Sequence, residues 1–278
     1  MSDARPNTEG NRRRTPWPLA VVAVLFVVVP FLTWYWTWFG RSLSDEEIGK
    51  YLSEDRPRHA QHALSQIAER FEKSDAEAGR WNAQVVATAS SPSPDVRMTA
   101  AWAMGAEHKS EEFRAALLRL AEDPEPIVRR NAALALVRFG DPRCRPELLA
   151  MLRPYTVVAP SEGTAETALT AGSYVKRDSL LVRFKFKPNI VEEIRSPLPG
   201  VIEKALVKDG DNWHVGAEHF VLAPDDEQAR DALIGLRYFG EAEDLPEVER
   251  FASGAKSGGL KWEAAQTAEA IRRRSAGK

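Results

Sequence analysis

The feature that most constrains the fold of this chain is an internal repeat. The segment PDVRMTAAWAMG (94–105) aligns with PIVRRNAALALVRFG (126–140) at an offset of 32 residues. The matched positions are Val96 with Val128, Arg97 with Arg129, Ala100 with Ala132, Trp102 with Leu134, and Leu117 with Leu149. A repeat of this length is typical of stacked helix pairs, in which each unit buries its apolar face against the next one.

Each unit begins with a Pro/Asp turn, continues into an Ala-rich helix and ends in a second apolar helix. We expect the small alanines to let neighbouring helices approach closely, with Leu, Met and Trp filling the gaps between them. A degenerate copy of the unit is visible at 57–71. The pattern resembles HEAT-like repeats, and this resemblance implies an α-solenoid over residues 44–153.

A further copy of the unit lies much later in the chain. Residues 231–251 match residues 131–151 at an offset of 100. This offset is much longer than one repeat period of 32 residues. The difference predicts a β-rich insertion at 154–224, followed by more HEAT-like helices at 225–278. The last helix is expected at 261–274, with an apolar stripe that faces the core. The residues of this stripe are Trp262, Ala265, Ala268 and Ile271. The alternative is an ordinary helical bundle whose Ala-rich helices are alike by chance.

An uncharged apolar stretch, WPLAVVAVLFVVVPFLTWYWTWF (17–39), precedes the repeats. As a helix it would extend roughly 34 Å, enough to cross a hydrocarbon core of about 30 Å. Bulky aromatic residues stand where a signal peptidase needs small ones, which favours an uncleaved anchor over a cleaved signal peptide. Arginines are concentrated in the polar tail 1–16, which is expected to be disordered. The positive-inside rule therefore places the tail in the cytoplasm and residues 40–278 in the periplasm of a bacterium.

The expected insertion is itself duplicated. VVAPSEGTAETALTAGSYVKRDSLLVRF (157–184) parallels IRSPLPGVIEKALVKDGDNWHVGAEHFVL (194–222). The matched positions are Pro160 with Pro197, Gly163 with Gly200, Gly172 with Gly210, and Asp178 with Gly216. Glycines supply the positive φ values that tight turns require. The two halves resemble the biotinyl/lipoyl and membrane-fusion-protein adaptor domains, and the resemblance implies a barrel-sandwich hybrid. The expected fold class is α+β: an N-terminal transmembrane helix and an α-solenoid interrupted by a small β-domain.

The resemblance also raises the question of a cofactor carried on a lysine. In biotinylated and lipoylated relatives the modified lysine precedes the proline of the second half by eight residues, which is Asn189 in this chain. Lys187 is the best candidate if a lysine is modified, but it lies out of register and Pro188 follows it. The ligases of those relatives are cytoplasmic, whereas the expected topology places this domain outside. We therefore expect no cofactor.

No arrangement of residues points to catalysis. His59 and His62 are spaced to face the same side of a helix, but no third metal ligand follows at a recognisable spacing. His214 and His219 are expected to pack in the β-domain, and Cys144 has no evident base beside it. The acids at 225–227 suit a helix N-terminus. Walker, nucleophile-elbow, HExxH and CxxC motifs are absent from the sequence. We expect a protein that is not an enzyme and holds no metal.

The composition narrows the classes of partner. The net charge is −2 and the isoelectric point is about 6.3, so no basic surface indicates nucleic acid. Solenoids present long surfaces to other proteins. The leading hypothesis is a membrane-anchored periplasmic scaffold or accessory subunit that binds protein partners, an inner-membrane or periplasmic complex. One alternative is a periplasmic adaptor of an export or efflux system, although the long coiled-coil hairpin of those adaptors is replaced here by a short link. Another is a biotin or lipoyl carrier subunit of an enzyme. Some HEAT-like repeats also resemble phycobiliprotein lyases, but those proteins contain no counterpart of the expected β-insertion.

Overall fold

The computed structural model describes residues 21–22, 24–31, 42–187 and 190–277. The chain divides into two units, residues 1–44 and residues 45–278. In the first unit, residues 21–22 and 24–31 are helical and carry exposed apolar side chains, Phe26 being 80% exposed. Within the described ranges, no helix has both the length and the apolar character needed to cross a membrane. The tail 1–16 and most of the expected span 17–39 lie outside the described residues.

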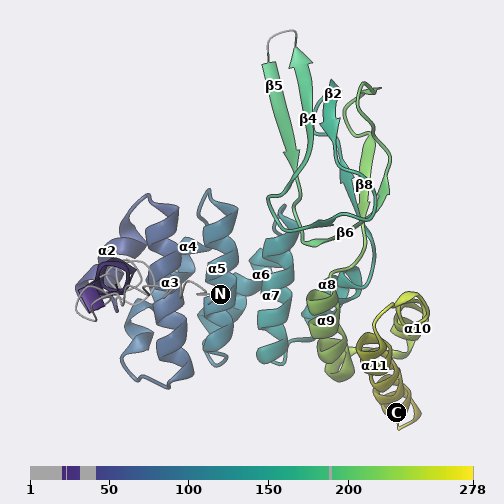
Figure 1. The fold of residues 1–278 in the computed structure, drawn as a ribbon. Coiled ribbons are helices and arrows are strands. Elements are labelled where there is room, and N and C mark those ends of the chain that lie inside the picture. The colour runs from purple at the N-terminus through teal and green to yellow at the C-terminus, as the bar shows by residue number, and fades with distance from the viewer. Residues whose placement is uncertain (1–20, 23, 32–41, 188–189, 278) are drawn as a thin grey trace, which may run out of the picture. The chain divides into compact units, whose positions relative to one another are not determined.

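The second unit consists of helices on either side of a block of β-strands (Figure 1). The helices before the strands are α2 (Asp45–Ser53), α3 (Pro57–Glu72), α4 (Asn82–Thr88), α5 (Pro94–Ala106), α6 (Glu111–Leu120), α7 (Pro126–Arg138) and α8 (Arg145–Met151). The helices after the strands are α9 (Asp226–Phe239), α10 (Leu245–Gly254) and α11 (Gly258–Ala276). The short 3₁₀ turns are η1 (Ala78–Trp81), η2 (Pro142–Cys144) and η3 (Ala242–Asp244).

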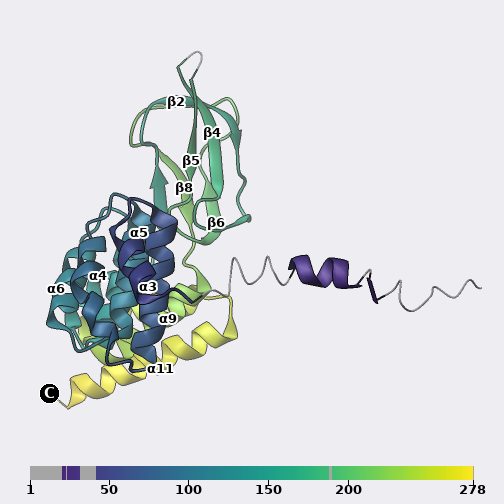
Figure 2. The same cartoon turned by 90° about the vertical axis from the view of Figure 1, so that its left-hand side faces the viewer.

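Proline sets the start of the first helix in each early unit. Pro57, Pro94 and Pro126 stand in the first turn of α3, α5 and α7, where no N–H is needed and the fixed φ favours a helix. These helices stand side by side in chain order, α9 lies next to α7, and α11 packs on α9 (Figure 1). We call α3, α5, α7, α9 and α11 the helix row. Figure 2 shows α4 and α6 on one side of α3 and α5, so the helices form two layers.

Alanines form the contacts within the helix row, as the sequence predicts. Ala100, Ala132 and Ala232 are fully buried at equivalent positions of α5, α7 and α9. Gly105 brings α5 still closer to α7, because a Cβ atom there would lie 2.9 Å from the Cβ of Ala135. The expectation that tryptophan fills the gaps between helices is wrong at Trp102, whose surface is 44% exposed. With alanine and glycine at the contact, the helices are too close to leave a gap for an indole.

An arginine at the same position of two units ties each helix to the turn before it. Arg97 donates a hydrogen bond to the Ser91 carbonyl at 2.9 Å, and Arg129 donates to the Asp123 carbonyl at 2.7 Å. Arg97 also donates two bonds to the Asp123 carboxylate, at 2.6 and 2.9 Å. Asp123 therefore links one unit to the next, which explains why the sequence repeats the arginine together with the apolar positions.

The elements recur 100 residues later on the far side of the strands. α7 and α9 begin at Pro126 and Asp226, η2 and η3 begin at Pro142 and Ala242, and α8 and α10 begin at Arg145 and Leu245. The two helix pairs are joined across the strands in sequence but lie together in space. Arg145 donates to the Asp244 carboxylate at 2.7 Å, and Arg130 donates to Gln228. The chain therefore resumes the same helical arrangement after the strands.

The sequence expectation for the last helix needs correction. Ala268 and Ile271 of the expected stripe are buried, but Trp262 is 58% exposed and Ala265 is also exposed, so the first half of the stripe does not face the core. The buried face of α11 consists of Leu260, Ala264, Thr267, Ala268 and Ile271. This helix begins three residues earlier than expected, and its face toward α9 is set by Leu260 and by Thr267, whose hydroxyl donates to the Leu233 carbonyl at 2.9 Å.

The strands form two four-stranded antiparallel sheets, which we call the β-module (155–222). The strands are β1 (Tyr155–Val158), β2 (Gly163–Ala168), β3 (Tyr174–Val175), β4 (Leu180–Lys187), β5 (Ile190–Arg195), β6 (Gly200–Ala205), β7 (Asn212–Trp213) and β8 (Glu218–Leu222). The order is β1-β8-β6-β3 in one sheet and β5-β4-β2-β7 in the other. The strands β1 to β4 of the first half correspond to β5 to β8 of the second half, in that order. The two strands of each corresponding pair lie in different sheets.

The backbone supports the duplication at the matched turns. Gly172 and Gly210 have φ values of 89° and 86°, and Asp178 and Gly216 have values of 62° and 82°. An aspartate is one of the few residues other than glycine that tolerates this conformation. Gly163 and Gly200 both lie against other atoms: a Cβ on Gly200 would meet the Ala223 carbonyl oxygen at 2.6 Å. The duplicated pattern in the sequence thus records duplicated turn geometry.

The core of the β-module contains one imidazole among apolar side chains. Phe184 and Phe220 are fully buried, and His219 is only 1% exposed. Trp213 meets His219 edge to face at 4.3 Å, and its indole N–H donates to the Ser161 carbonyl at 2.9 Å. His219 occupies the position that Leu181 fills in the first half, counted from the matched turns, and Leu181 is likewise buried.

Candidate functional site

The helix row exposes a large apolar side chain at one position of three successive units. Trp102 on α5, Leu134 on α7 and Ile234 on α9 are equivalent at the offsets of 32 and 100 residues. Trp102 is 44% exposed, Leu134 is half-buried, and Ile234 is 37% exposed. The contacts within the row are already made by the alanines that precede these residues. The three side chains therefore form a continuous apolar surface that the fold itself does not require.

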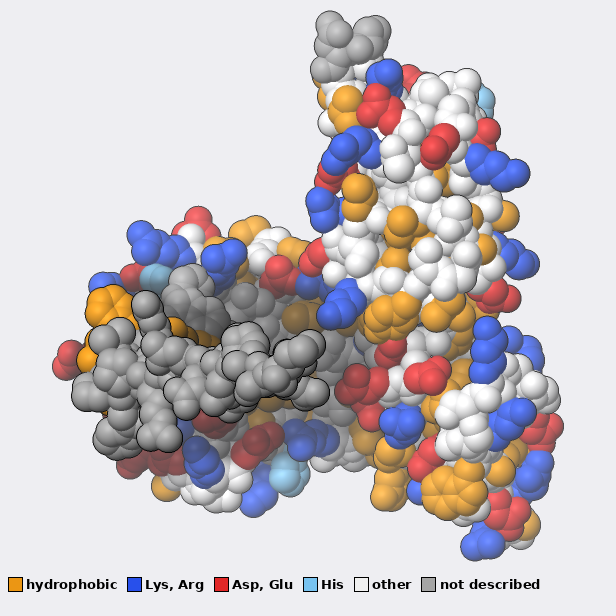
Figure 3. Space-filling model, in the orientation of Figure 1, with side chains coloured by type: hydrophobic (Ala, Val, Ile, Leu, Met, Phe, Trp, Pro, Cys, Tyr) orange, Lys and Arg blue, Asp and Glu red, His pale blue; other side chains and the backbone are white. Residues whose placement is uncertain are grey.

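These side chains line a groove of about 420 Å³ across α3, α5, α7 and α9. The groove is lined by Glu72, Trp102, Gly105, Asn131, Leu134, Ala135, Val137, Arg138, Asp231 and Ile234. Gly105 and Ala135 line the bottom of the groove, where the backbones of α5 and α7 come close together. The larger side chains of the lining stand on either side of them. We call this feature the row groove. Figure 3 shows hydrophobic side chains over α9 and α11, with acidic and basic ones between them.

The row groove has carboxylates at both ends. Glu72 stands at the end of α3, and Asp231 lies one turn after Glu227 on α9. Partial burial and the nearby Glu227 carboxylate raise the pKa of Asp231. Among the ion pairs of the described residues, none involves Glu72 or Asp231. The one cationic side chain that lines the groove, Arg138, donates to the Gly105 carbonyl at 3.2 Å. The groove thus has apolar side chains along its length, with Asn131 and Arg138 among them, and a carboxylate at each end.

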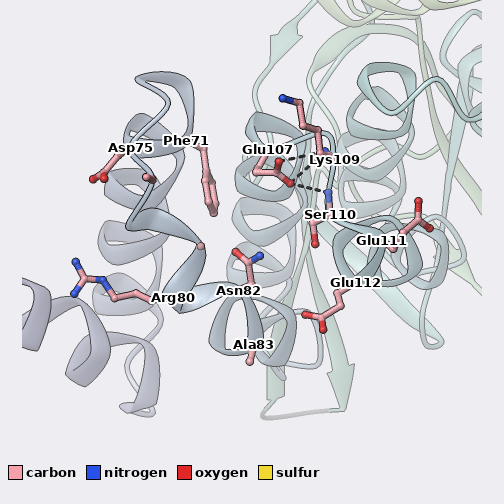
Figure 4. A pocket seen from close by; sticks show the side chains of 12 residues that line it. Phe71, Asp75, Arg80, Asn82, Ala83, Glu107, Lys109, Ser110, Glu111 and Glu112 are labelled. Carbon is pink, nitrogen blue, oxygen red and sulfur yellow. Dashed lines mark hydrogen bonds between the residues drawn. The ribbon is translucent and has the colours of Figure 1, made fainter.

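A second, shallower pocket of about 770 Å³ lies between the α3–α4 and α5–α6 connections (Figure 4). Phe71 and Arg80 line one side, and Glu107 lies on the other. The Glu107 carboxylate accepts hydrogen bonds from the amides of Lys109 and Ser110, at 3.2 and 2.8 Å. This carboxylate is therefore engaged in holding the turn before α6. The pocket is explained by the connection of two helices.

A third cavity, of about 460 Å³, lies where the β-module joins the helices. Val201 and Ile202 from β6 form one wall, and Phe251 and Leu260 from α10 and α11 form the other. Arg250 lines it too, but this guanidinium is paired with Glu247 and donates to the Leu152 carbonyl at 3.4 Å. The cavity follows from the contact of a curved sheet with a helix end.

A buried ionic cluster holds the helices at the same junction. Arg130 is 4% exposed, and burial lowers its pKa to about 10. Its Nε lies 3.9 Å from the Glu147 carboxylate, and burial raises the pKa of Glu147. Arg129 donates to the same carboxylate at 3.2 Å. The cluster thus joins α7, α8 and, through Gln228, α9. The Arg130 Nε makes no hydrogen bond, and the contacts of the cluster given above all lie within the fold.

The structure places Lys187 at the end of β4, exposed and paired in register with Ile190. Its ammonium lies 5.0 Å from the centre of the Phe186 ring. Asn189, where a modified lysine would be expected, lies outside the described residues together with Pro188. No contact of the described residues sets Lys187 apart from an ordinary lysine at a strand end.

The histidines of the helices are used locally. The His59 Nδ1 atom lies 2.6 Å from a Glu54 carboxylate oxygen, and its ring stacks on Tyr51 at 4.1 Å. His62 bonds to Gln66 one turn later at 3.0 Å. Within the described ranges, no group of three or more His, Cys, Asp or Glu side chains is arranged to hold a metal ion.

The remaining residues considered from the sequence also have structural surroundings. Cys144 is buried, and burial raises the pKa of its thiol to about 12, so the reactive thiolate is disfavoured. Asp225 caps α9 by accepting hydrogen bonds from the amides of Glu227 and Gln228, each at 3.2 Å. His219 packs in the β-module core as expected, whereas the expectation that His214 packs there is wrong, because its side chain is exposed.

Comparison with known proteins identifies the helical part alone. Residues 82–159 match the family described as HEAT repeats. The match covers α4 to α8 and all of β1, and it includes both units found at the offset of 32 residues. No curated protein matches the chain. The matched segment is thus a HEAT-like repeat region, a kind of structure that commonly mediates contacts between proteins.

The row groove was not predicted from the sequence, although a signal for it was present. The alignment pairs Trp102 with Leu134 and, at the offset of 100, Leu134 with Ile234. A buried alanine stands two residues before the large one in each case, at Ala100, Ala132 and Ala232. A large apolar residue next to a completed contact face is a sign of a surface that serves another purpose. The carboxylates Glu72 and Asp231 lie far apart in sequence, so their shared location needed the fold.

Proposed function

We propose that this chain is a non-enzymatic, membrane-anchored periplasmic scaffold or accessory subunit that holds a partner protein of a membrane complex. The observation that carries the proposal is the exposed apolar position repeated at Trp102, Leu134 and Ile234. Exposed apolar surface of this kind, next to polar groups, is typical of protein interfaces. The HEAT-like match at 82–159 supports a protein partner rather than a small molecule.

The proposed anchor is the apolar segment 17–39. Its described part, residues 21–22 and 24–31, is helical with apolar side chains exposed on all sides. A helix that is apolar all around needs an apolar environment, and a bilayer supplies one. The arginines of the tail 1–16 favour a cytoplasmic N-terminus. A single anchor of this type would keep the helix row close to membrane partners.

The β-module is proposed to be a barrel-sandwich hybrid that carries no cofactor and serves as a rigid contact module. Its two sheets are exchanged by the internal duplication, and the paired turns at Gly172 and Gly210 support the resemblance. The ion pair of Arg145 with Asp244 and the hydrogen bond of Arg130 to Gln228 join the helices on either side of it. This arrangement supports a role in which the β-module keeps a fixed shape and contacts other proteins.

The test is purification of the tagged full chain from native membranes in mild detergent, with a chain that begins at residue 42 as the matched control. We expect one or a few proteins to remain with the full chain at comparable amounts, and the shorter chain to leave the membrane fraction. A reporter fused after Lys278 should be active only when exported. A full chain that purifies alone, or a reporter active in the cytoplasm, would contradict the proposal.

A further inference from the structure

The row groove has features that define what could fill it. It crosses neighbouring helices, so Trp102, Leu134 and Ile234 lie one after another along it. Packed helix axes are about 8–10 Å apart, which sets the spacing of these three side chains. We propose that the row groove binds an amphipathic α-helix of the partner protein, with apolar residues on one face and Lys or Arg beside that face. This inference rests on the proposed scaffold function and names the partner's chemistry.

The groove favours a helix over an extended segment because of backbone hydrogen bonding. The surface is made of helices, whose backbone groups are bonded within each helix, and it offers no strand edge. An extended peptide would leave its own N–H and C=O groups unpaired against the apolar floor. A helix satisfies these groups internally. Apolar residues two turns apart on it are separated by about 10 Å, which matches the spacing of the row.

The charges at the groove favour a basic partner. Glu72 and Asp231 stand at its two ends, and Glu227 is one turn from Asp231. A lysine or arginine beside Asp231 would relieve the repulsion between Asp231 and Glu227, whereas an acidic side chain would add to it. Arg138 also lines the groove and keeps its positive charge, because its hydrogen-bond partner is the neutral Gly105 carbonyl, but the two carboxylates Glu72 and Asp231 outnumber it. The groove therefore complements a helix whose apolar face is flanked by positive charge.

The shape of the floor fits the same occupant. Gly105 lies so close to α7 that a side chain there would meet Ala135, so the groove is deepest between α5 and α7. Trp102 and Ile234 stand on either side of this low point, each with more than a third of its surface exposed. Successive apolar residues on one face of a partner helix would contact Trp102, Leu134 and Ile234 in turn. Tryptophan is among the residues that contribute most to binding when such a contact buries them.

The first experiment is site-specific photo-crosslinking of the full chain in native membranes. A benzoylphenylalanine replaces Leu134 in the row groove, with separate control positions at Glu112 on α6 and Glu192 on β5. Crosslinked peptides are then identified by mass spectrometry. We expect crosslinks from position 134 to one segment of another protein that is apolar at helical spacing and carries Lys or Arg beside those positions. The control positions should not give this segment.

The second experiment measures binding of a synthetic peptide of the crosslinked segment to the purified full chain. Trp102→Ala should weaken binding about ten-fold or more, whereas the matched control Trp262→Ala, an exposed tryptophan of α11, should leave it unchanged. Asp231→Asn and Glu72→Gln should each weaken binding about three- to ten-fold, and Glu192→Gln on β5 should not. Replacing the basic residues of the peptide with Gln should produce the same loss. Circular dichroism of each variant checks that the helices remain folded.

The possible outcomes distinguish a failure of the row-groove proposal from a failure of the scaffold proposal. Crosslinks at Glu112 or Glu192 but none at Leu134 would overturn the row groove and leave the scaffold in place. If none of the three positions gave a crosslink to a protein, both the row-groove proposal and the scaffold proposal would be overturned. Crosslinks from Leu134 to a second copy of this chain, to lipid or to an acidic segment would overturn the basic helix as occupant. Equal losses from Trp102→Ala and Trp262→Ala would do the same.

Discussion

The helix row and the β-module are each built from copies of a repeating unit of their own. The copies of the row differ at an exposed position, and the copies of the module differ at a buried one. In the row the buried alanine is kept from Ala100 to Ala232, and the exposed position changes from Trp102 to Ile234. In the module the turns keep their geometry, and the core changes from a leucine to His219. The change from Trp102 to Ile234 thus falls on a surface that a partner can touch. In the module the change falls inside, where it acts on stability.

The largest effect is expected where the module core is emptied. Phe184 is fully buried, with its ring centre 5.3 Å from that of Trp213. Phe184→Ala should lower the free energy of unfolding of the module by about 3–5 kcal/mol, because it removes burial and leaves a cavity. Hydrogen exchange of the full chain should show the lost protection in the strands, with the helix row unaffected. Equal loss of protection in α5 and α7 would show that the two regions do not vary independently.

A smaller loss is expected where the duplicated turn of the module excludes a side chain. Gly200 has a φ of 154°, and a Cβ there would meet the Ala223 carbonyl oxygen at 2.6 Å. Gly200→Ala should lower the free energy of unfolding by about 2–3 kcal/mol. Gly254→Ala is the matched control, since nothing lies within 4 Å of a Cβ at the end of α10. Denaturant unfolding measures both, and a neutral Gly200→Ala would contradict the close approach.

His219 is the point at which the second half of the module departs from the first. Neither of its ring nitrogens has a hydrogen-bond partner, and burial lowers its pKa. The unfolded state therefore binds a proton first as pH falls through about 6.5, and stability decreases from there down to the lower pKa of the folded state. His219→Leu should raise the free energy of unfolding by about 1–2 kcal/mol at neutral pH, because the leucine leaves no buried nitrogen unpaired.

The same substitution should remove the decrease in stability below pH 6.5, as measured by denaturant unfolding across a pH series. His214→Leu is the control, because that side chain is exposed and should leave the pH dependence unchanged. A variant with leucine at 219 that still loses stability in this pH range would show that another group is responsible.

The smallest change in stability is expected on the exposed face of the row. Trp102→Ala should lower the free energy of unfolding by about 1–2 kcal/mol, since 44% of the surface of this residue is already in solvent. Met104→Ala, two residues away and fully buried, should cost about 2–5 kcal/mol. Thermal unfolding of the two variants side by side gives the comparison. A similar cost for both would place Trp102 in the core after all.

Much of the local structure could be predicted from the sequence, because it depends on residues close together in the chain. The Ala-rich segments and the prolines before them predict α5 and α7, and the offset of 32 residues places them side by side. The match of Asp178 with Gly216 predicted a shared turn, and both residues have a positive φ. These features need only periodicity and the conformational limits of single residues.

The faces of individual helices were harder to predict. A stripe through Trp262 and one through Leu260 are both consistent with helical spacing in α11, and only packing against α9 distinguishes them. Trp102 was expected inside because it is large and apolar, whereas the buried Ala100 and Gly105 leave no room for it. The acidic ends of the row groove come from α3 and α9, which are separated by the whole β-module in sequence. Such a site depends on long-range contacts.

The pairing of β1 with β8 has a mechanical consequence. Tyr155 and Leu222 are direct neighbours in this pairing, so the chain enters and leaves the module at one place. In the helical part, Arg145 before the module and Asp244 after it are joined at 2.7 Å. A pull along the chain from α2 to α11 would pass through these clamps rather than through the sheets. The module is therefore sheltered from tension, and it can hold its shape while the helices bear a load.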